Sequence, residues 1–317
     1  MPVTLSEAKK NVQDALQMGV IDEFRKSNWL LDNIIFDDAV SPTGGGATLT
    51  YAYTRLITQP TAAFRAVNEE YTPQEVQKQR YTVDLKIFGG AFEIDRIIAG
   101  MGGIINEVTL QMQQKIKAAQ ALFNDTVING DSAVDAKAFD GLDKALTGSD
   151  TEYVPDNTID LSDSQAIDAN WREFLDQFDE FLMNLDGTPS AIMGNTKMIA
   201  RIRAIARRAG AYTETKDDFG RQINMYDGIP LIDLGAKPGT NDPVVPIAQD
   251  GTTSLYVVRL GLDGFHAVSM AGQPPIRTWM PDFTTAGAVK RGEVEMVAAV
   301  ALKATKAAGV FRDIKVA

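Results

Sequence analysis

Two β-rich runs separated by a polar stretch, between residues 48 and 96, constrain the fold of this chain more than any other feature. The first run is TLTYAYTRLITQPTAAFRAV (48–67), the polar stretch is NEEYTPQEVQKQR (68–80), and the second run is YTVDLKIFGGAFEIDR (81–96). Residues that favour strands are frequent in both runs, and the second alternates apolar and polar side chains. We therefore predict one extended β-hairpin with a polar tip.

This hairpin is too polar to bury a core on both of its faces. Its flanks carry charged side chains at Arg55, Arg65, Glu69, Glu70, Glu75, Lys78 and Arg80. A two-stranded hairpin by itself is only marginally stable in water. It therefore needs another surface to lie against, and no obvious partner sheet follows it directly in the sequence.

A long amphipathic helix is predicted next, over residues 103–128. Apolar side chains recur there at steps of three or four residues, which places them on one helix face: Ile104, Val108, Met112, Ile116, Ala119, Phe123 and Val127. No proline interrupts the segment, and Asn129-Gly130 is a typical helix end. Such a helix spans about 40 Å. A long helix behind a long hairpin predicts an elongated protein rather than a compact enzyme.

The first 47 residues predict an arm in front of the hairpin. Residues 5–18 and 20–31 are two short amphipathic runs, and a glycine-rich linker, SPTGGGA, follows at 41–47. Two interpretations remain open. The runs are either surface helices on the protein's own core, or an arm whose apolar face is covered by a neighbouring subunit.

The rest of the chain predicts a mixed module and a closing strand. A helix is expected over 163–185, with an aromatic and apolar core stripe at Trp171, Phe174, Leu175, Phe178 and Leu182. The module has a helix over 196–210 and four strands, at 190–194, 228–235, 253–261 and 264–270. Residues 286–317 alternate toward valine and alanine, as a closing strand would.

Composition and charge exclude several classes of function. The 317 residues contain 31 Lys and Arg against 42 Asp and Glu, a net charge of −11, which does not favour non-specific coating of DNA. The absence of cysteine excludes disulfides, thiolate nucleophiles and cysteine metal sites. No signal peptide and no run of 18 apolar residues occurs, so we expect a soluble protein made in a cytoplasm.

Three features are candidate functional sites, and none carries chemistry. The only histidine, His266, lies within a strand without a recognisable acidic partner, which favours a packed or hydrogen-bonded residue over a general base. The DSAVD segment (131–135) lacks the glycine and glutamate of a calcium loop. The basic side chains of the 196–210 helix favour a solvated face over a nucleic-acid or subunit contact; they are Lys197, Arg201, Arg203, Arg207 and Arg208.

Phosphate loops, dinucleotide fingerprints and zinc-protease motifs are also absent from the sequence. We therefore predict a protein that is not an enzyme. No residue is assigned to catalysis, to a cofactor or to a metal, and no cofactor is expected.

The order of the elements resembles that of the major capsid proteins of tailed bacteriophages, which share the HK97-like fold. Several stretches are similar as well: ALFNDTVINGD (121–131), FDGLDKAL (139–146), AIMGNTKMIARIR (191–203), DGIPLIDL (227–234) and VEMVAAVALKATKAAGVFRDI (294–314). Each motif is weak alone, and their order and spacing over nearly the whole chain carry the resemblance.

The resemblance implies an α+β fold with the domains of that family. It assigns 1–47 to the N-terminal arm, 48–96 to the extended hairpin called the E-loop, and 187–285 to the axial (A) domain. The peripheral (P) domain takes 97–186 and 286–317, with the spine helix at 103–128.

The implied function is self-assembly into hexamers and pentamers of an icosahedral shell that encloses the double-stranded DNA of a tailed phage. The implied location is the virion capsid, assembled in the host cytoplasm. Implied partners are further copies of the chain, a portal and decoration proteins, with DNA enclosed without specific binding and no membrane. A chain that starts almost at the arm favours a separate scaffolding protein.

Two alternatives stay open. An encapsulin, the shell of a bacterial nanocompartment, shares this fold and holds enzyme cargo instead of a genome. A small-molecule binding or hydrolase module in 187–285 is disfavoured by the single histidine and the missing cysteine.

Overall fold

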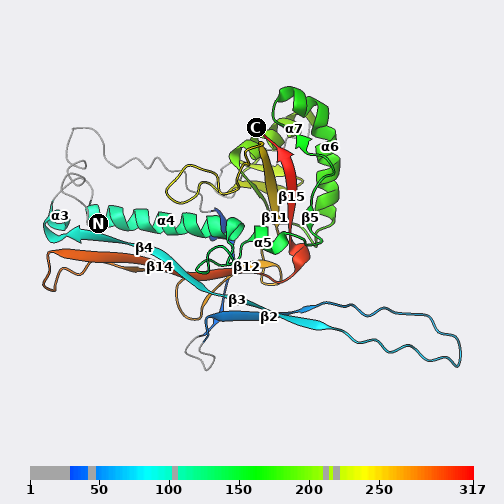
Figure 1. Ribbon diagram of the computed structural model, residues 1–317, viewed down its shortest axis with the longest axis horizontal. Coiled ribbons are helices and arrows are strands. Elements are labelled where there is room, and N and C mark those ends of the chain that lie inside the picture. Colours follow the sequence, from blue (N-terminus) through cyan, green and yellow to red (C-terminus); the bar gives the residue numbers. More distant parts are fainter. Residues whose placement is uncertain (1–28, 42–47, 102–105, 210–213, 217–221) are drawn as a thin grey trace.

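The computed structural model describes residues 29–41, 48–101, 106–209, 214–216 and 222–317 (Figure 1). The predicted arm helices at 5–18 and 20–31 lie almost entirely outside the described residues, as do most of the 41–47 linker and Ile104. The described helices and strands, in chain order, are α2 (Trp29–Asn33), β1 (Phe36–Val40), β2 (Thr50–Leu56), β3 (Lys78–Asp84), β4 (Lys86–Asp95), α3 (Arg96–Gly100), α4 (Glu107–Asn129), α5 (Leu142–Leu146), β5 (Glu152–Tyr153), β6 (Ile159–Asp160), α6 (Ser164–Met183), β7 (Ala191–Gly194), α7 (Thr196–Ala209), β8 (Glu214–Lys216), β9 (Gln222–Tyr226), β10 (Ile229–Asp233), β11 (Thr252–Val258), β12 (Phe265–Met270), β13 (Ile276–Trp279), β14 (Val289–Leu302), the 3₁₀ turn η2 (Thr305–Ala307) and β15 (Ala308–Lys315).

A five-stranded sheet is built around the long strand β14. Along one edge β14 pairs antiparallel with β4, from Val289 opposite Asp95 to Ala298 opposite Lys86. Along its other edge it pairs first with β13 and then with β12, which in turn pairs parallel with β1. The hairpin β2–β3 forms a separate two-stranded sheet that projects from the body (Figure 1).

Helix α4 is the predicted long helix, and it lies along β4 and β14 (Figure 1). The side chain of Asn106 caps its first turn by accepting from the amide of Thr109 over 3.2 Å. The predicted apolar stripe is buried at Val108, Met112, Ala119, Phe123 and Val127, and Ile116 packs beside it. The helical periodicity of the sequence therefore identified the buried face correctly.

Gly130 ends α4 as predicted, but glycine is required there for a different reason than at most helix ends. Its φ of −62° is open to any residue, so no left-handed conformation is needed. A Cβ at this position would lie 2.2 Å from the carbonyl oxygen of Phe139. The glycine is thus required by the close approach of the chain that returns after the helix.

An eight-stranded sheet forms the second part of the body, with α6 and α7 packed against one of its faces (Figure 1). On that face Phe174, Phe178 and Phe181 of α6 meet Phe311 of β15, and all four side chains are buried. Trp171, Leu175 and Leu182 are partly buried at the margin of this cluster. The stripe predicted for this helix is therefore core, as expected.

The predicted strand over 81–96 is wrong as a single element. The chain leaves the hairpin at Leu85, and β4 continues as a neighbour of β14 instead of β2. The hairpin is therefore shorter than predicted. It also has the partner sheet that the sequence did not reveal, because the partner strand lies some two hundred residues further along the chain.

The predicted closing strand over 286–317 is likewise two strands in two sheets. β14 belongs to the five-stranded sheet, whereas β15 pairs with β11 in the eight-stranded sheet. Conversely, β12 and β13 come from the predicted module at 187–285 but join β14. Strand pairing thus crosses the predicted boundary at residue 286. One buried cluster also spans both sheets, with Phe265 and Val300 on one side and Val258 and Val310 on the other.

Candidate functional site: the projecting hairpin and its base

The outer part of the hairpin is the segment of the described structure that most clearly lacks a partner. Its ladder runs from Thr50 opposite Asp84 to Leu56 opposite Lys78. Beyond it, residues 57–77 continue as an extended loop whose two sides are joined at a few points, such as the amide of Gln77 donating to Thr58 over 2.8 Å. The segment ends in a turn at Val67 and Asn68.

The outer part of the hairpin exposes large apolar side chains. Phe64 is fully exposed, and Val67 and Tyr71 near the tip are 87% and 60% exposed. Leu56 and Ile57, where the ladder ends, are more than half exposed as well. Grouped apolar side chains of this kind are typical of surfaces that another molecule covers.

The base of the hairpin, in contrast, is firmly packed on the five-stranded sheet. We refer to the buried apolar residues at this contact as the base cluster, which consists of Val40, Tyr51, Leu85, Val268, Val297 and Ala301. Tyr51 and Leu85 come from the start and the end of the hairpin, and the other members come from β1, β12 and β14. Among the described residues, the hairpin is thus held at one end only.

Arg55 fastens the hairpin to the turn after β14. Its guanidinium donates to the backbone carbonyls of Leu302 and Lys303, the latter from Nε over 2.8 Å. It also lies over the ring of Tyr81, 4.4 Å from the centroid. Tyr53 adds a hydrogen bond from its hydroxyl to the carbonyl of Leu302 over 2.9 Å. These contacts fix the direction in which the hairpin leaves the body.

His266 lies beneath this base and is completely buried. Its ring is edge-on to that of Tyr51, with 5.8 Å between centroids, and neither ring nitrogen has a hydrogen-bond partner in the described part of the chain. Burial lowers the pKa of His266, and nearby Lys303 lowers it further. The predicted packed strand histidine is confirmed. Asp37, 4.0 Å away, is a carboxylate neighbour that the sequence did not reveal because it lies on β1.

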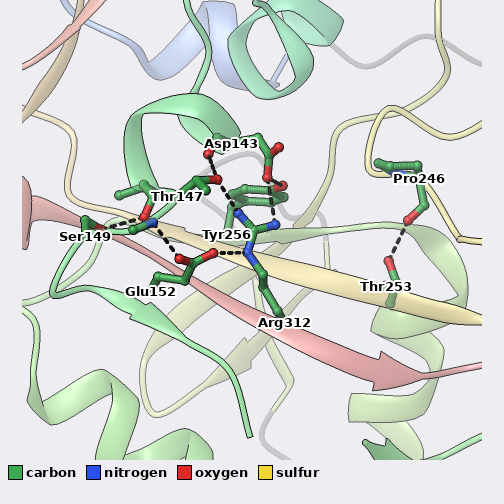
Figure 2. Close-up of polar contacts among 10 residues, drawn as sticks. Asp143, Thr147, Ser149, Glu152, Pro246, Thr253, Tyr256 and Arg312 are labelled. Atoms are coloured by element: carbon green, nitrogen blue, oxygen red, sulfur yellow. Dashed lines mark hydrogen bonds and ion pairs between the residues drawn. The ribbon is translucent and has the colours of Figure 1, made fainter.

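A second polar cluster surrounds Arg312 on β15 (Figure 2). The guanidinium pairs with Asp143 over 2.8 Å and with Glu152, and the hydroxyl of Tyr256 also donates to Asp143 over 2.8 Å. Burial opposes the charge of Arg312, but the bonds to the two carboxylates outweigh it and raise the pKa. Burial likewise raises the pKa of Tyr256. A fully paired arginine and a neutral phenol supply neither a nucleophile nor a base, so this cluster ties α5 to the sheet.

The acidic segment after α4 is neutralised by a lysine. Lys144 lies 2.7 Å from a carboxylate oxygen of Asp131 and 2.8 Å from one of Asp140. Hydrogen bonds from Lys144 lower the pKa of Asp131. No group of three metal-ligating side chains occurs among residues 29–41, 48–101, 106–209, 214–216 and 222–317. The ammonium group of Lys144 supplies the positive charge that balances Asp131 and Asp140.

Most of the basic side chains of α7 are exposed, in agreement with the predicted solvated face, and Arg201 is the exception at intermediate exposure. Arg208 pairs with Asp168 of α6, and Arg201 donates to the carbonyls of Ser162 and Val316. Lys197 and Arg207 are exposed. Part of the predicted basic cluster therefore stabilises the packing of α7 within the protein.

The module at 187–285 contributes to a cavity of about 620 Å³ between α6, α7 and the end of β9. Its lining is mainly apolar, and its phenol, that of Tyr226, donates to Asp179 over 2.5 Å. Burial raises the pKa of Tyr226, so it stays protonated near neutral pH. The described residues that line the cavity form no arrangement suited to hydrolysis. In the described part of the chain, no helix is long and apolar enough to span a membrane.

A comparison with known proteins shows which solved structures share this architecture. No protein-family model matches the chain, and no curated protein sequence matches it either. Among solved structures, the holo-SrpI encapsulin complex from Synechococcus elongatus PCC 7942 is 14% identical and matches 99% of this chain and 97% of its own, with a TM-score of 0.66. Mycobacterium phage Bobi is 13% identical over 98% and 99%, with a TM-score of 0.59. The capsid of Myoviridae Phage XM1 is 10% identical over 95% and 97%, with a TM-score of 0.57.

The fold is therefore the HK97-like fold of viral capsid and encapsulin shells, as the order of elements in the sequence predicted. Within that class the chain resembles both phage capsids and an encapsulin over nearly its full length.

Proposed function

We propose that this chain is the major capsid protein of a tailed phage and that it assembles with itself into hexamers and pentamers of an icosahedral shell around double-stranded DNA. The observation that carries the proposal is the hairpin, which is fastened at its base and exposes apolar side chains along its outer half. Such an element gains its stability from contact with another subunit. The role is structural, and catalysis plays no part in it.

In this proposal β2–β3 and the loop at 57–77 act as the E-loop, and α4 acts as the spine helix. We assign most of the eight-stranded sheet, with α6 and α7, to the A domain, and the five-stranded sheet with α4 to the P domain. This changes the boundaries expected from the sequence, which put α6 and β15 in the P domain and β12 and β13 in the A domain. Rings of five and six copies need heterologous contacts that close, and an arm-like hairpin reaching a neighbour provides one half of such a contact. The virion is the corresponding location, with scaffolding, portal and decoration proteins as partners.

The first experiment is negative-stain electron microscopy of the protein expressed alone and with its neighbouring genes. Closed angular shells are expected, and uniform monomers under both conditions would overturn the proposal. Deleting residues 60–78 removes the exposed part of the hairpin while leaving Tyr51, Arg55 and Leu85 in place. This variant should give folded subunits without shells, because the base cluster stays intact. Shells from the deletion variant would contradict the proposed role of the hairpin.

An encapsulin shell is the second candidate, and the match to the holo-SrpI complex at a TM-score of 0.66 favours it. The two candidates differ in what the shell encloses. Shells made with the neighbouring genes should protect DNA from added nuclease if the chain is a phage capsid protein. An enzyme that co-purifies inside the shells and is bound through a terminal peptide would establish an encapsulin instead.

A further inference from the structure

The contact between the hairpin base and the sheet contains an unusual polar arrangement around one oxygen atom. The Oδ2 atom of Asp37 accepts a hydrogen bond from the hydroxyl of Tyr51 over 2.7 Å. Nε2 of His266 lies 4.0 Å from the same oxygen, and Nζ of Lys303 lies 3.8 Å from it. Three groups that can donate a hydrogen bond thus surround one acceptor. They lie at the base of the hairpin, which is where the described residues attach it to the body.

His266 is the member of this group whose hydrogen-bonding capacity is not satisfied. It is completely buried, and no hydrogen bond of good geometry reaches either ring nitrogen in the described part of the chain, although the backbone of Gly264 lies close enough to act on the ring. A buried polar group without a partner is costly, so a small movement that supplies one is favoured. Asp37 is the carboxylate within reach. Its oxygen is already used by Tyr51, which lies on β2 and therefore moves with the hairpin.

We propose that His266 and Asp37 form a proton-operated latch for the hairpin: uptake of a proton by the His266 ring draws Asp37 away from Tyr51 and loosens the base of the hairpin. In the latched state the imidazole is neutral and Tyr51 holds Asp37. In that state the imidazole proton is on Nδ1 and Nε2 carries the lone pair; a proton from solvent binds Nε2, and the resulting Nε2–H donates to Oδ2 of Asp37. Tyr51 then loses its partner, and β2 loses a polar contact with β1.

The groups around His266 act in both directions on its pKa, and the net effect is to lower it. Burial is the main cause that lowers its pKa, and Lys303 acts in the same direction. Asp37, the Gly264 backbone and Asp263 act in the opposite direction. Because the ring binds its proton more weakly when the hairpin is latched, a fall in pH favours the loosened state. The latched state is complete well above the ordinary histidine pKa of about 6.5 and is lost progressively below it.

The latch concerns the chain itself and does not depend on the proposed function. It gives the hairpin two positions that a modest change in pH can exchange. In a shell, such a change would alter the direction in which each subunit reaches its neighbour. The protein is well suited to a direct test, since it has one histidine and no cysteine.

The test measures the distance between the hairpin and the body as a function of pH. Thr82→Cys on β3 and Lys306→Cys on η2 are at exposed positions and carry spin labels for double electron–electron resonance. Labelled chains are mixed with excess unlabelled chain so that distances within one subunit dominate in any assembly. The pH range of about 5.2 to 7.5 stays above the ordinary carboxyl pKa of about 4.

A second distance population is expected to grow as the pH falls, with a one-proton midpoint below about 6.5. In His266→Gln, which cannot titrate, the distances should not change over this range. Tyr51→Phe, which lacks the hydroxyl, should show the second population already at the upper end of the range. Asp263→Asn removes a nearby exposed carboxylate that raises the pKa of His266, so it should keep the one-proton response with its midpoint shifted slightly to lower pH. An unchanged distance in the wild type, or the same response in His266→Gln, would overturn the latch.

A second measurement needs no variant and so covers the case in which His266→Gln does not fold. The rate at which the imidazole C2 proton exchanges with deuterium, followed by mass spectrometry, reports the pKa of the single histidine in subunits and in shells alike. A pKa below about 6.5 that coincides with the distance midpoint is expected. A pKa at or above that value would refute the proposal.

Discussion

The hydroxyl of Tyr53 donates a hydrogen bond over 2.9 Å to the backbone carbonyl of Leu302, a residue 249 positions away in the sequence. This bond joins the hairpin near the beginning of the chain to the end of β14. Arg55, two residues further on, binds the same carbonyl and that of Lys303. The direction of the hairpin thus depends on a turn that is made much later in the chain.

Arg55→Ala should loosen the hairpin and lower stability, because the Lys303 carbonyl loses its guanidinium donor and the Leu302 carbonyl keeps only the hydroxyl of Tyr53. Hydrogen bonds to charged groups contribute about 1.5–3 kcal/mol, which sets the expected loss in the free energy of unfolding. Urea denaturation of the subunit measures it. Arg80→Ala on the opposite strand is the matched control, since Arg80 is exposed, and it should change stability by less than about 0.5 kcal/mol. Equal losses in both variants would contradict the anchoring role of Arg55.

Phe64→Ser together with Val67→Ser should abolish or strongly reduce shell formation without affecting the fold of the subunit. Both side chains are largely exposed, so their removal costs the isolated subunit little. The neighbouring subunit that covers these side chains would then lose its apolar contact with the hairpin. Size-exclusion chromatography and electron microscopy detect assembly, and thermal melting checks the fold. Glu70→Gln, at an exposed position of the same tip, should assemble normally.

Gly89→Ala should weaken the pairing of β4 with β14. A Cβ at this position would lie 2.0 Å from the carbonyl oxygen of Val294, which is backbone and cannot turn aside. Overpacking of this kind costs about 1–3 kcal/mol. Gly100→Ala is the control, since a Cβ added there would meet no atom within 4 Å among the described residues beyond its chain neighbours and its own helix. If both variants unfold at the same urea concentration, the close approach of the strands is not limiting.

Arg312→Ala should be more damaging than the loss of an exposed arginine. It leaves Asp143 and Glu152 without their shared cation, and breaking a buried ion pair from one side costs about 3–5 kcal/mol. Because Asp143 is partly exposed, solvent screening reduces the expected loss to about 2–3 kcal/mol. Arg291→Ala, on the exposed part of β14, is the control. Denaturation curves that coincide for the two variants would show that the cluster is not structural.

Much of the local structure follows from the sequence. The three- and four-residue spacing of apolar side chains identified α4 and α6 with their buried faces, and the apolar runs bounded by turns identified β7, β10, β11 and β12. The packed state of His266 was predicted as well. These features are local, because a helix or strand period records which side of the segment avoids water.

Pairing partners were not predictable in the same way. Alternation continues across Leu85, yet β3 stays in the hairpin and β4 joins β14. Likewise, the valine and alanine pattern after residue 286 reads as one strand, although η2 divides it between two sheets. The contact between His266 and Asp37 depends on the parallel pairing of β12 with β1, which nothing near either residue indicates.

The sequence by itself therefore determined the main helices and several strands, their order and their buried faces, and the order was sufficient to indicate the HK97-like fold. Only the tertiary structure decided which strands pair, where the hairpin is fastened and which groups surround His266. The physical reason is that side-chain periodicity reports burial along one segment. Strand pairing is instead a choice among distant segments with similar patterns, and it is made by the packing of the whole core.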